Sequence, residues 1–174
     1  MKIGLISDTH GLLRPEALEA LRGCDHILHA GDIGNRSVIE QLEMIAPVTA
    51  VSGNVDGYEE SGFPTEAIIK LNSFRIAIRH VVFEGGKLTK EGKAFLDRTR
   101  PDICIFGHTH QPKSEWLGDT LLFNPGSAGP KRLDGRSAAM TLPCIAQKAL
   151  KSQGRRLSTI LTAGWLGAAR RSRD

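Results

Sequence analysis

Seven side chains in the first two thirds of this sequence have the chemistry of metal ligands. They are three oxygen donors and four histidines: Asp8, His10, Asp32, Asn54, His80, His108 and His110. They supply eight ligand bonds if Asp32 bridges, because one carboxylate can bind two cations through its two oxygens. Two cations held in this way activate a water molecule for hydrolysis. The sequence therefore predicts a two-metal hydrolytic site.

Each of these residues has an ordinary structural explanation when it is taken alone. Asp8 and Asp32 can cap a helix or a turn, and Asn54 after Gly53 is typical of a tight turn. His108 and His110 are harder to explain, because they directly follow an apolar strand and buried imidazoles without partners are costly. One shared metal site explains the whole set more economically than separate structural roles.

Three further polar residues near this set are expected to have other roles. His26 and His29 lie within a strand of buried type, which favours a hydrogen-bonded position in the core or behind the ligands over metal contact. Asp56 fits a role in orienting a ligand or a loop rather than in binding metal directly.

The first ligands follow apolar strands that alternate with helices. We expect strands at 2–7, 26–30 and 48–52 and helices at 15–22 and 36–45. This β-α-β-α-β order implies parallel strands with right-handed crossovers, and open α/β sheets place ligands at the carboxyl ends of such strands. Asp8 and His10 stand two apart, so an extended backbone would put both side chains on one face.

The second half of the sequence predicts more strands and one further helix. We expect a helix at 87–100 that Pro101 stops, and a tight turn at 124–127. The predicted strands are 67–71, 74–80, 102–106, 113–117 and 120–123, with a last pair at 137–142 and 156–162. We expect one domain over residues 1–162 and a basic C-terminal tail over 163–174.

Composition is that of a globular protein, with 40% hydrophobic and 24% charged residues in 174. Three scattered cysteines, Cys24, Cys104 and Cys144, do not form a disulfide framework, and no leader or membrane span is expected, so we predict a cytoplasmic protein. Residues 1–130 carry 13 Lys and Arg against 17 Asp and Glu, whereas residues 131–174 carry 10 against 2. The basic pI therefore reflects the C-terminal segment, and nucleic acid is not the expected partner.

The order D-x-H, GD, GN, H and GHxH makes the sequence resemble the calcineurin-like metallophosphoesterases, over residues 2 to about 132. Within that family it is similar to the small bacterial and archaeal phosphodiesterases, which share an Asn-Pro-Gly-Ser stretch like residues 124–127. The resemblance implies an α/β fold: a four-layer α/β/β/α sandwich with two mixed sheets. It also implies that Asp8, His10, Asp32 and His110 hold one metal. Asp32, Asn54, His80 and His108 would hold the other.

The function that the resemblance implies is hydrolysis of small phosphodiesters by a metal-bridging hydroxide. The ions would be two divalent transition metals, manganese first and nickel, iron or zinc as alternatives. Asn54, His80 and His10 are the expected catalytic residues. Val55 stands where many relatives carry a histidine that protonates the leaving group, so a general acid is missing. Val81 and Val82 also differ from the His-Gly-His that relatives often have around this position.

Two other functions are weighed against this one. The family includes a retromer subunit that uses the fold for protein contacts, but such a protein tends to lose the histidine of D-x-H, and His10 is present. The other function is that of a nuclease, which the basic tail would bring to nucleic acid. The sequence does not support it, because it lacks a pattern of aromatic residues on which bases could stack. Relatives often form dimers or larger assemblies, so a homo-oligomer is compatible with the resemblance.

Overall fold

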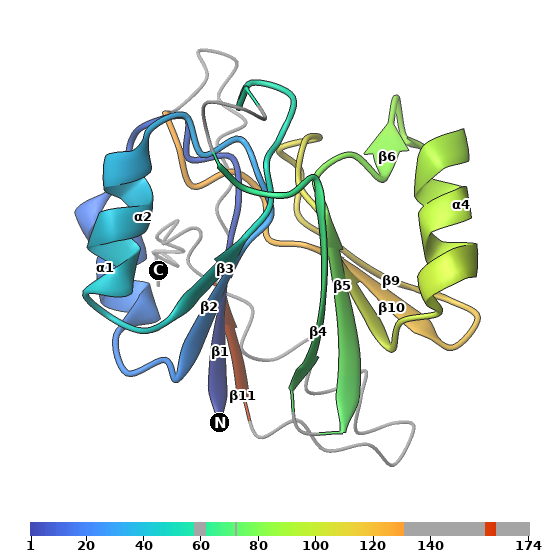
Figure 1. Cartoon of the computed structure of the whole chain (residues 1–174), viewed down its shortest axis with the longest axis horizontal. Helices are drawn as coiled ribbons and strands as arrows, with labels where there is room; N and C mark the ends of the chain where they lie inside the picture. Colours follow the sequence, from blue (N-terminus) through green and yellow to red (C-terminus); the bar gives the residue numbers. More distant parts are fainter. Residues whose placement is uncertain (58–61, 72, 131–158, 163–174) are drawn as a thin grey trace, which may run out of the picture.

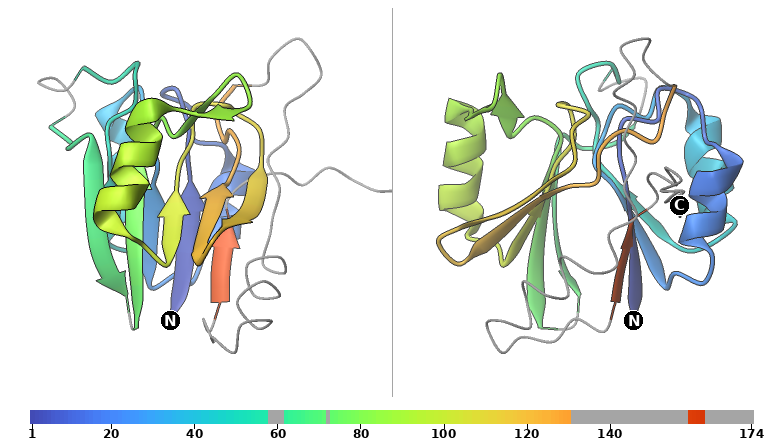
Figure 2. Two further views of the ribbon diagram at one scale, coloured as in Figure 1. Left: turned by 90° about the vertical axis from the view of Figure 1, so that its right-hand side faces the viewer. Right: turned by 180° about the vertical axis from the view of Figure 1, so that it is seen from behind.

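Two β-sheets pack face to face, and helices cover their outer faces (Figure 1). The computed structural model describes residues 1–57, 62–71, 73–130 and the strand at 159–162. Seen from behind, α1 and α2 lie on one outer face and α4 on the other (Figure 2). The predicted α/β/β/α sandwich is confirmed.

The first sheet is built from the N-terminal β-α-β-α-β unit. Its helices are α1 (Pro15–Leu21) and α2 (Arg36–Glu43), and both begin at the predicted residue. Pro15 opens α1, and Asn35 caps α2. Its strands are β1 (Lys2–Ile6), β2 (His26–His29), β3 (Val48–Ala50) and β11 (Thr159–Thr162) in the order β11-β1-β2-β3. All four strands are parallel.

The second sheet is mixed. Its strands are β4 (Glu66–Leu71), β5 (Phe74–Arg79), β8 (Ile103–Ile105), β10 (Thr120–Asn124) and β9 (Lys113–Leu117), in that spatial order. The edge strands β4 and β9 are antiparallel to their neighbours, and the three central strands are parallel. A small hairpin of β6 (Phe83–Glu84) and β7 (Lys87–Leu88) leads into α4 (Lys90–Thr99).

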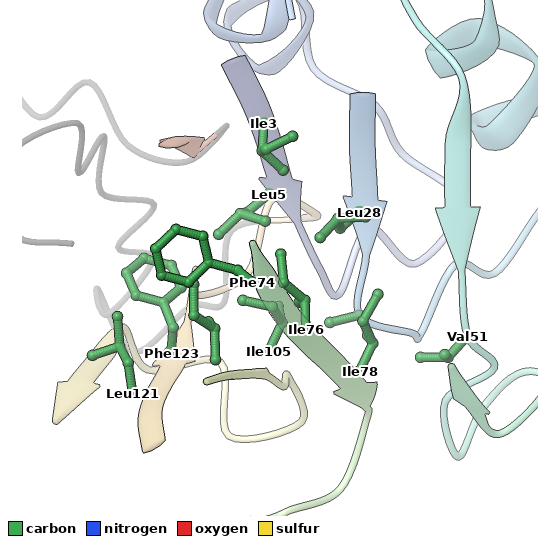
Figure 3. Close-up of a cluster of buried hydrophobic side chains, with 12 residues drawn as sticks. Ile3, Leu5, Leu28, Val51, Phe74, Ile76, Ile78, Ile105, Leu121 and Phe123 are labelled. Carbon is green, nitrogen blue, oxygen red and sulfur yellow. The ribbon is translucent and has the colours of Figure 1, made fainter. Parts of the chain in front are cut away.

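The main core lies between the two sheets (Figure 3). Leu5 and Leu28 from the first sheet meet Ile76, Ile78 and Phe123 from the second, and all five are almost fully buried. Ile76 and Ile78 stand two apart in the predicted strand 74–80 and lie on this face. Successive side chains of a strand point to opposite faces, so α4 and its own cluster cover the other face of the sheet.

Two features of the predicted fold need correction. The helix predicted at 87–100 begins only at Lys90, because Gly85 and Gly86 turn the chain into the β6–β7 hairpin and Thr89 caps the helix through the Gly92 N–H. The described strands of the first sheet are all parallel, not mixed.

The last predicted strand is confirmed in part. It runs over Thr159–Thr162 and pairs in parallel with β1. Its predicted partner at 137–142 and the tail at 163–174 lie outside the described residues.

This topology brings the loops that carry the predicted ligands to one end of the molecule. Strands β1, β2, β3 and β5 all run toward the end drawn uppermost in Figure 1. Among the described residues, no helix is long and apolar enough to cross a membrane.

Candidate metal centre

Each predicted ligand lies in the loop that follows the carboxyl end of a strand. Asp8 and His10 follow β1, Asp32 follows β2, Asn54 follows β3, His80 follows β5, and His108 and His110 follow β8. The five loops belong to both sheets, so the site spans the junction between them.

Four of these side chains form a tight group. The ligand atoms of Asp8, His10, Asp32 and His110 all lie within 4.8 Å of one another. The His110 Nε2 atom is 3.1 Å from Asp8 Oδ1 and 3.1 Å from His10 Nε2, and His10 Nε2 is 3.9 Å from Asp32 Oδ2. These are the four residues of the first predicted ligand set.

The second predicted set is brought together as two neighbouring pairs. The His80 Nε2 atom is 3.2 Å from Asp32 Oδ1, and His108 Nδ1 is 2.9 Å from Asn54 Oδ1. The rings of His80 and His108 lie 5.5 Å apart, centre to centre. Asp32 is the residue shared by both sets, with one oxygen toward each.

The buried atoms of the centre match the needs of a cation. The Nδ1–H group of His80 donates to the Ala30 carbonyl at 2.7 Å, so in the neutral ring the Nε2 atom presents a lone pair that a cation can bind. That Nε2 atom and Asp8 Oδ2 are buried and make no hydrogen bond within the described structure. Buried lone pairs that face carboxylate oxygens are costly unless a positive charge lies among them. The donor set therefore fits divalent cations.

The titration of His80 and Asp32 points in the same direction. Burial opposes charge on His80, but the carboxylates of Asp32 and Asp8 outweigh it and raise the pKa of this imidazole. Burial also opposes charge on Asp32, but His80, the Val55 N–H and His10 lower the pKa of this carboxyl. The site favours an anionic carboxylate beside a positive charge.

Five of the seven predicted ligands have a left-handed backbone. Their φ angles are 54° at Asp8, 47° at His10, 53° at Asp32, 65° at His108 and 57° at His110. Such conformations cost non-glycine residues on the order of 1–3 kcal/mol each and gather at functional sites. The expectation that an extended strand aligns Asp8 with His10 is wrong, because β1 ends at Ile6 and a turn brings the two side chains together.

Glycines precede three of the ligands because the site leaves no space for a side chain there. A Cβ atom on Gly53 would lie 2.1 Å from Asp32 Oδ1. One on Gly107 would lie 2.6 Å from Asp8 Oδ2 and 2.1 Å from Ser7 Oγ. The GN and GH pairs of the sequence thus reflect close approach as well as turn geometry.

Asp56 joins two of the ligand loops. Its carboxylate accepts hydrogen bonds from the backbone N–H groups of Ile33 and Gly53 at 2.9 Å and of Gly34 at 2.8 Å. Ile33 follows Asp32 and Gly53 precedes Asn54, so the contact ties the Asp32 loop to the Asn54 loop.

The turn at 124–127 supports the centre in a way that sequence reasoning missed. The buried Asn124 amide donates to the Gly107 carbonyl at 2.8 Å, and Ser127 Oγ donates to the Asp8 carbonyl at 2.9 Å. The sequence predicts only a tight turn here. The signal that could have revealed the supporting role is Asn124, a polar residue directly after the apolar strand predicted at 120–123.

His29 lies behind the ligands, with both ring nitrogens occupied. It is fully buried, its Nδ1 atom is 3.2 Å from the Gly31 N–H nitrogen, and its Nε2 atom is 3.0 Å from Thr9 Oγ1. Burial lowers the pKa of this imidazole to about 4, so the ring is neutral at physiological pH. His26, in contrast, contacts Thr49 at the far end of β2.

Two pockets open beside the centre. A cavity of about 410 Å³ lies next to His108 and is lined by the β6–β7 hairpin and by Thr109 and Lys113. Glu84, on that hairpin, has Oε1 3.9 Å from His108 Nε2. A smaller pocket of about 130 Å³ is lined by Val55, Asp56 and Phe63.

The chain is similar to known proteins in sequence and in fold. The model of the calcineurin-like phosphoesterase superfamily domain matches residues 1–144. A probable metallophosphoesterase of Methanothermobacter thermautotrophicus is 39% identical over 139 residues, which cover 76% of this chain and 80% of that protein. A phosphodiesterase of Escherichia coli strain K12 is 30% identical over 151 residues, covering 73% and 79%. The zinc complex of Vps29 from Entamoeba histolytica has a TM-score of 0.61 at 26% identity, covering 72% of this chain and 73% of that one.

Substituting Gly53 by alanine is expected to weaken cation binding by at least about tenfold, because the added methyl group displaces the Asp32 carboxylate. Zinc titration of chelator-stripped protein measures this effect. Gly118→Ala is the control, since a Cβ there meets nothing within 4 Å, although its φ of 58° costs about 1 kcal/mol. Equal zinc affinity in the two variants would contradict the close-approach argument.

Acid is expected to destabilise the metal-free protein through His29. The unfolded imidazole takes up a proton near its ordinary pKa of 6.5 and the folded one only near 4, so between these values the unfolded state binds more protons. The free energy of unfolding should fall by about 3 kcal/mol from this group as pH drops through that window. Urea unfolding between about pH 7 and pH 4.5 should give a flatter profile for His29→Phe. Parallel profiles would show that His29 does not carry the effect.

Proposed function

We propose that this chain, which belongs to the calcineurin-like phosphoesterase superfamily, is a phosphodiesterase that hydrolyses small phosphodiesters with two divalent transition-metal ions. The observation that carries the proposal is the convergence of Asp8, His10, Asp32 and His110, whose ligand atoms lie within 4.8 Å of one another. The buried and unpartnered Asp8 Oδ2 and His80 Nε2 atoms support it.

Two ligand sets share Asp32. Asp8, His10, Asp32 and His110 would hold one ion, and Asp32, Asn54, His80 and His108 the other. Mixed carboxylate and imidazole ligands suit manganese, and also iron, nickel or zinc, better than magnesium or calcium. When bound, such ions supply an activated water near neutral pH and neutralise the charge of the phosphate.

The side chains of the centre differ in how they can act. Asn54 is exposed and the His10 side chain is 26% exposed, so both can contact the phosphoryl oxygens of a bound substrate. His80 is 2% exposed and its Nδ1–H group is bound to Ala30, so it acts from beneath as a ligand and does not touch substrate. Asp56 orients the Asp32 and Asn54 loops through three N–H groups.

The leaving group receives little help from the chain. Val55 follows Asn54, is 52% exposed and donates its N–H to Asp32 Oδ1 at 3.1 Å. Asp56 lines the same small pocket, but its carboxylate is occupied as an acceptor of three N–H groups and is poorly placed to donate a proton. The arrangement favours diesters with a good leaving group.

The substrate that fits is small. The cavity of about 410 Å³ beside His108 has the size of a site for one alcohol substituent of a diester. Residues 1–130 carry more acidic than basic side chains, which disfavours a long polyanion such as nucleic acid. The location that suits this function is the cytoplasm, and a homo-oligomer is compatible with it.

A protein-binding scaffold with weak or no catalysis is the second candidate. The likeness to Vps29 structures at 26% identity favours it. Against it stands His10, which is present and lies 3.1 Å from His110 within the ligand group. Metal-dependent hydrolysis decides between the two functions.

Removal of metal is expected to abolish hydrolysis of bis(p-nitrophenyl) phosphate, and manganese should restore it. His10→Ala and Asn54→Ala should lower kcat/KM by on the order of 100-fold or more, because each removes a ligand that substrate can reach. The control is His26→Ala, whose ring is hydrogen-bonded to Thr49 at the far end of β2. An inactive wild-type protein with manganese, nickel and zinc would refute the proposed enzyme and leave the scaffold.

Replacing Val55 by histidine is expected to help poor leaving groups. A general acid contributes about 10²–10⁴-fold, so kcat for an alkyl phosphodiester should rise at least about tenfold, whereas the p-nitrophenyl ester should change little. Val55→Asn controls for polarity without a titrating group. The same gain in both variants, or a gain for both substrates alike, would exclude the missing proton donor as the cause.

A further inference from the structure

We infer that Thr9 and His29 form a buried hydrogen-bonded pair, the His29–Thr9 latch, that fixes the two loops carrying Asp8, His10 and Asp32. The inference rests on the proposed function only in that these residues bind cations. His29 is then a positioning residue, because it touches neither substrate nor metal.

A continuous line of hydrogen bonds runs through the latch. The Gly31 N–H group donates to His29 Nδ1 at 3.2 Å, so the ring proton sits on Nε2. That Nε2–H group donates to Thr9 Oγ1 at 3.0 Å, and the Thr9 hydroxyl donates to the Ile33 carbonyl at 3.0 Å. The Thr9 hydroxyl also lies 3.5 Å from the Asp32 carbonyl, a longer contact than the one to Ile33. The Gly31 N–H group sets the direction of the bonds along the line.

The ends of this line fall beside the ligands. Thr9 stands between Asp8 and His10, and Gly31 and Ile33 flank Asp32. These ligands are three of the residues with left-handed backbones, which need surrounding contacts to hold them. Backbone bonds from Asp8 to Gly31 and from His10 to Asp32, both 2.9 Å, join the same two loops. The latch adds a side-chain contact on the buried side of the two loops, and this contact fixes the distance between the loops.

Burial makes the latch specific for these side chains. Thr9 and His29 are both fully buried, so a partner lost by substitution leaves a polar group without water to replace it. Valine matches threonine in shape but cannot accept from His29 or donate to Ile33. Serine keeps both bonds, so Thr9→Ser is the conservative variant and Thr9→Val the disruptive one.

The chain contains a matched pair that is remote from the ligands. His26 Nε2 and Thr49 Oγ1 are 2.8 Å apart and join β2 to β3 near the opposite end of the same strand. Thr49→Val removes this bond and tests whether any histidine–threonine pair of the sheet affects the metal centre.

The experiment is a zinc chloride titration of the chelator-stripped full chain, followed by calorimetry, with thermal unfolding of the same samples. Thr9→Val and His29→Phe should each weaken zinc binding about 10–100-fold, the range for partners that orient ligands, and the double variant should lose no more than one of them. Thr9→Ser and Thr49→Val should bind zinc like the wild type. Zinc affinity unchanged in Thr9→Val, whatever its thermal stability, would overturn the latch as a positioning device.

A second measurement uses only the wild-type protein, so it does not depend on whether a variant folds. Nitrogen-15 NMR of the wild-type histidines should show His29 as the neutral form protonated at Nε2, and the other tautomer would overturn the latch. Neither readout uses catalysis. A protein that binds zinc through an intact latch but hydrolyses no diester refutes the proposed function alone, and a hydrolase whose zinc affinity ignores Thr9 refutes the latch alone.

Discussion

The rest of the structure depends on one electrostatic constraint: two carboxylates and several imidazole lone pairs converge where little water reaches them. Asp8 and Asp32 are at most 2% exposed, and His80 Nε2 faces both. Buried carboxylates that share a site repel each other unless cations or donors lie between them. The loops, glycines and supporting side chains around the centre are the means by which the fold holds this arrangement.

The constraint explains why rigid strands and unusual loops occur side by side. The side chains must turn inward directly after the strands end, and this turn needs left-handed backbones at five ligands. At on the order of 1–3 kcal/mol each, such strain is comparable with the net stability of a domain, so the packed sheets must offset it. The inter-sheet core provides that stabilisation, and Asp56, Asn124 and Ser127 fix the loops through backbone groups.

How well the sequence predicts a feature of the fold or the site depends on how far apart in the sequence the contacting residues lie. The β-α-β-α-β unit and the strand before His108 follow local hydrophobic patterns, so their residues could be assigned from the sequence. Asp8 and Asp32 could be grouped because parallel strands end at one edge of a sheet. The bond from Asn124 to the Gly107 carbonyl and the role of Thr9 join distant segments and have no local signal. The β6–β7 hairpin was missed because helical spacing continues through Lys87 and hides the turn at Gly85 and Gly86.

The ligands of the centre are unequally buried, and this bears on how such a site changes its substrate. Asp8 and Asp32 are buried, and His110 is only 14% exposed, so a substitution there disturbs the core as well as the ligands. Asn54, His10 and His108 lie nearer to solvent. Asn54 is next to Val55, and His108 is next to the hairpin that carries Glu84. Val55 and Glu84 are exposed, so other residues fit there at small cost to stability. The departure at Val55 falls on this open side. The buried ligands that bind the cations are therefore constrained by the packing of the core. The residues beside the leaving group are exposed, and the packing of the core does not constrain them.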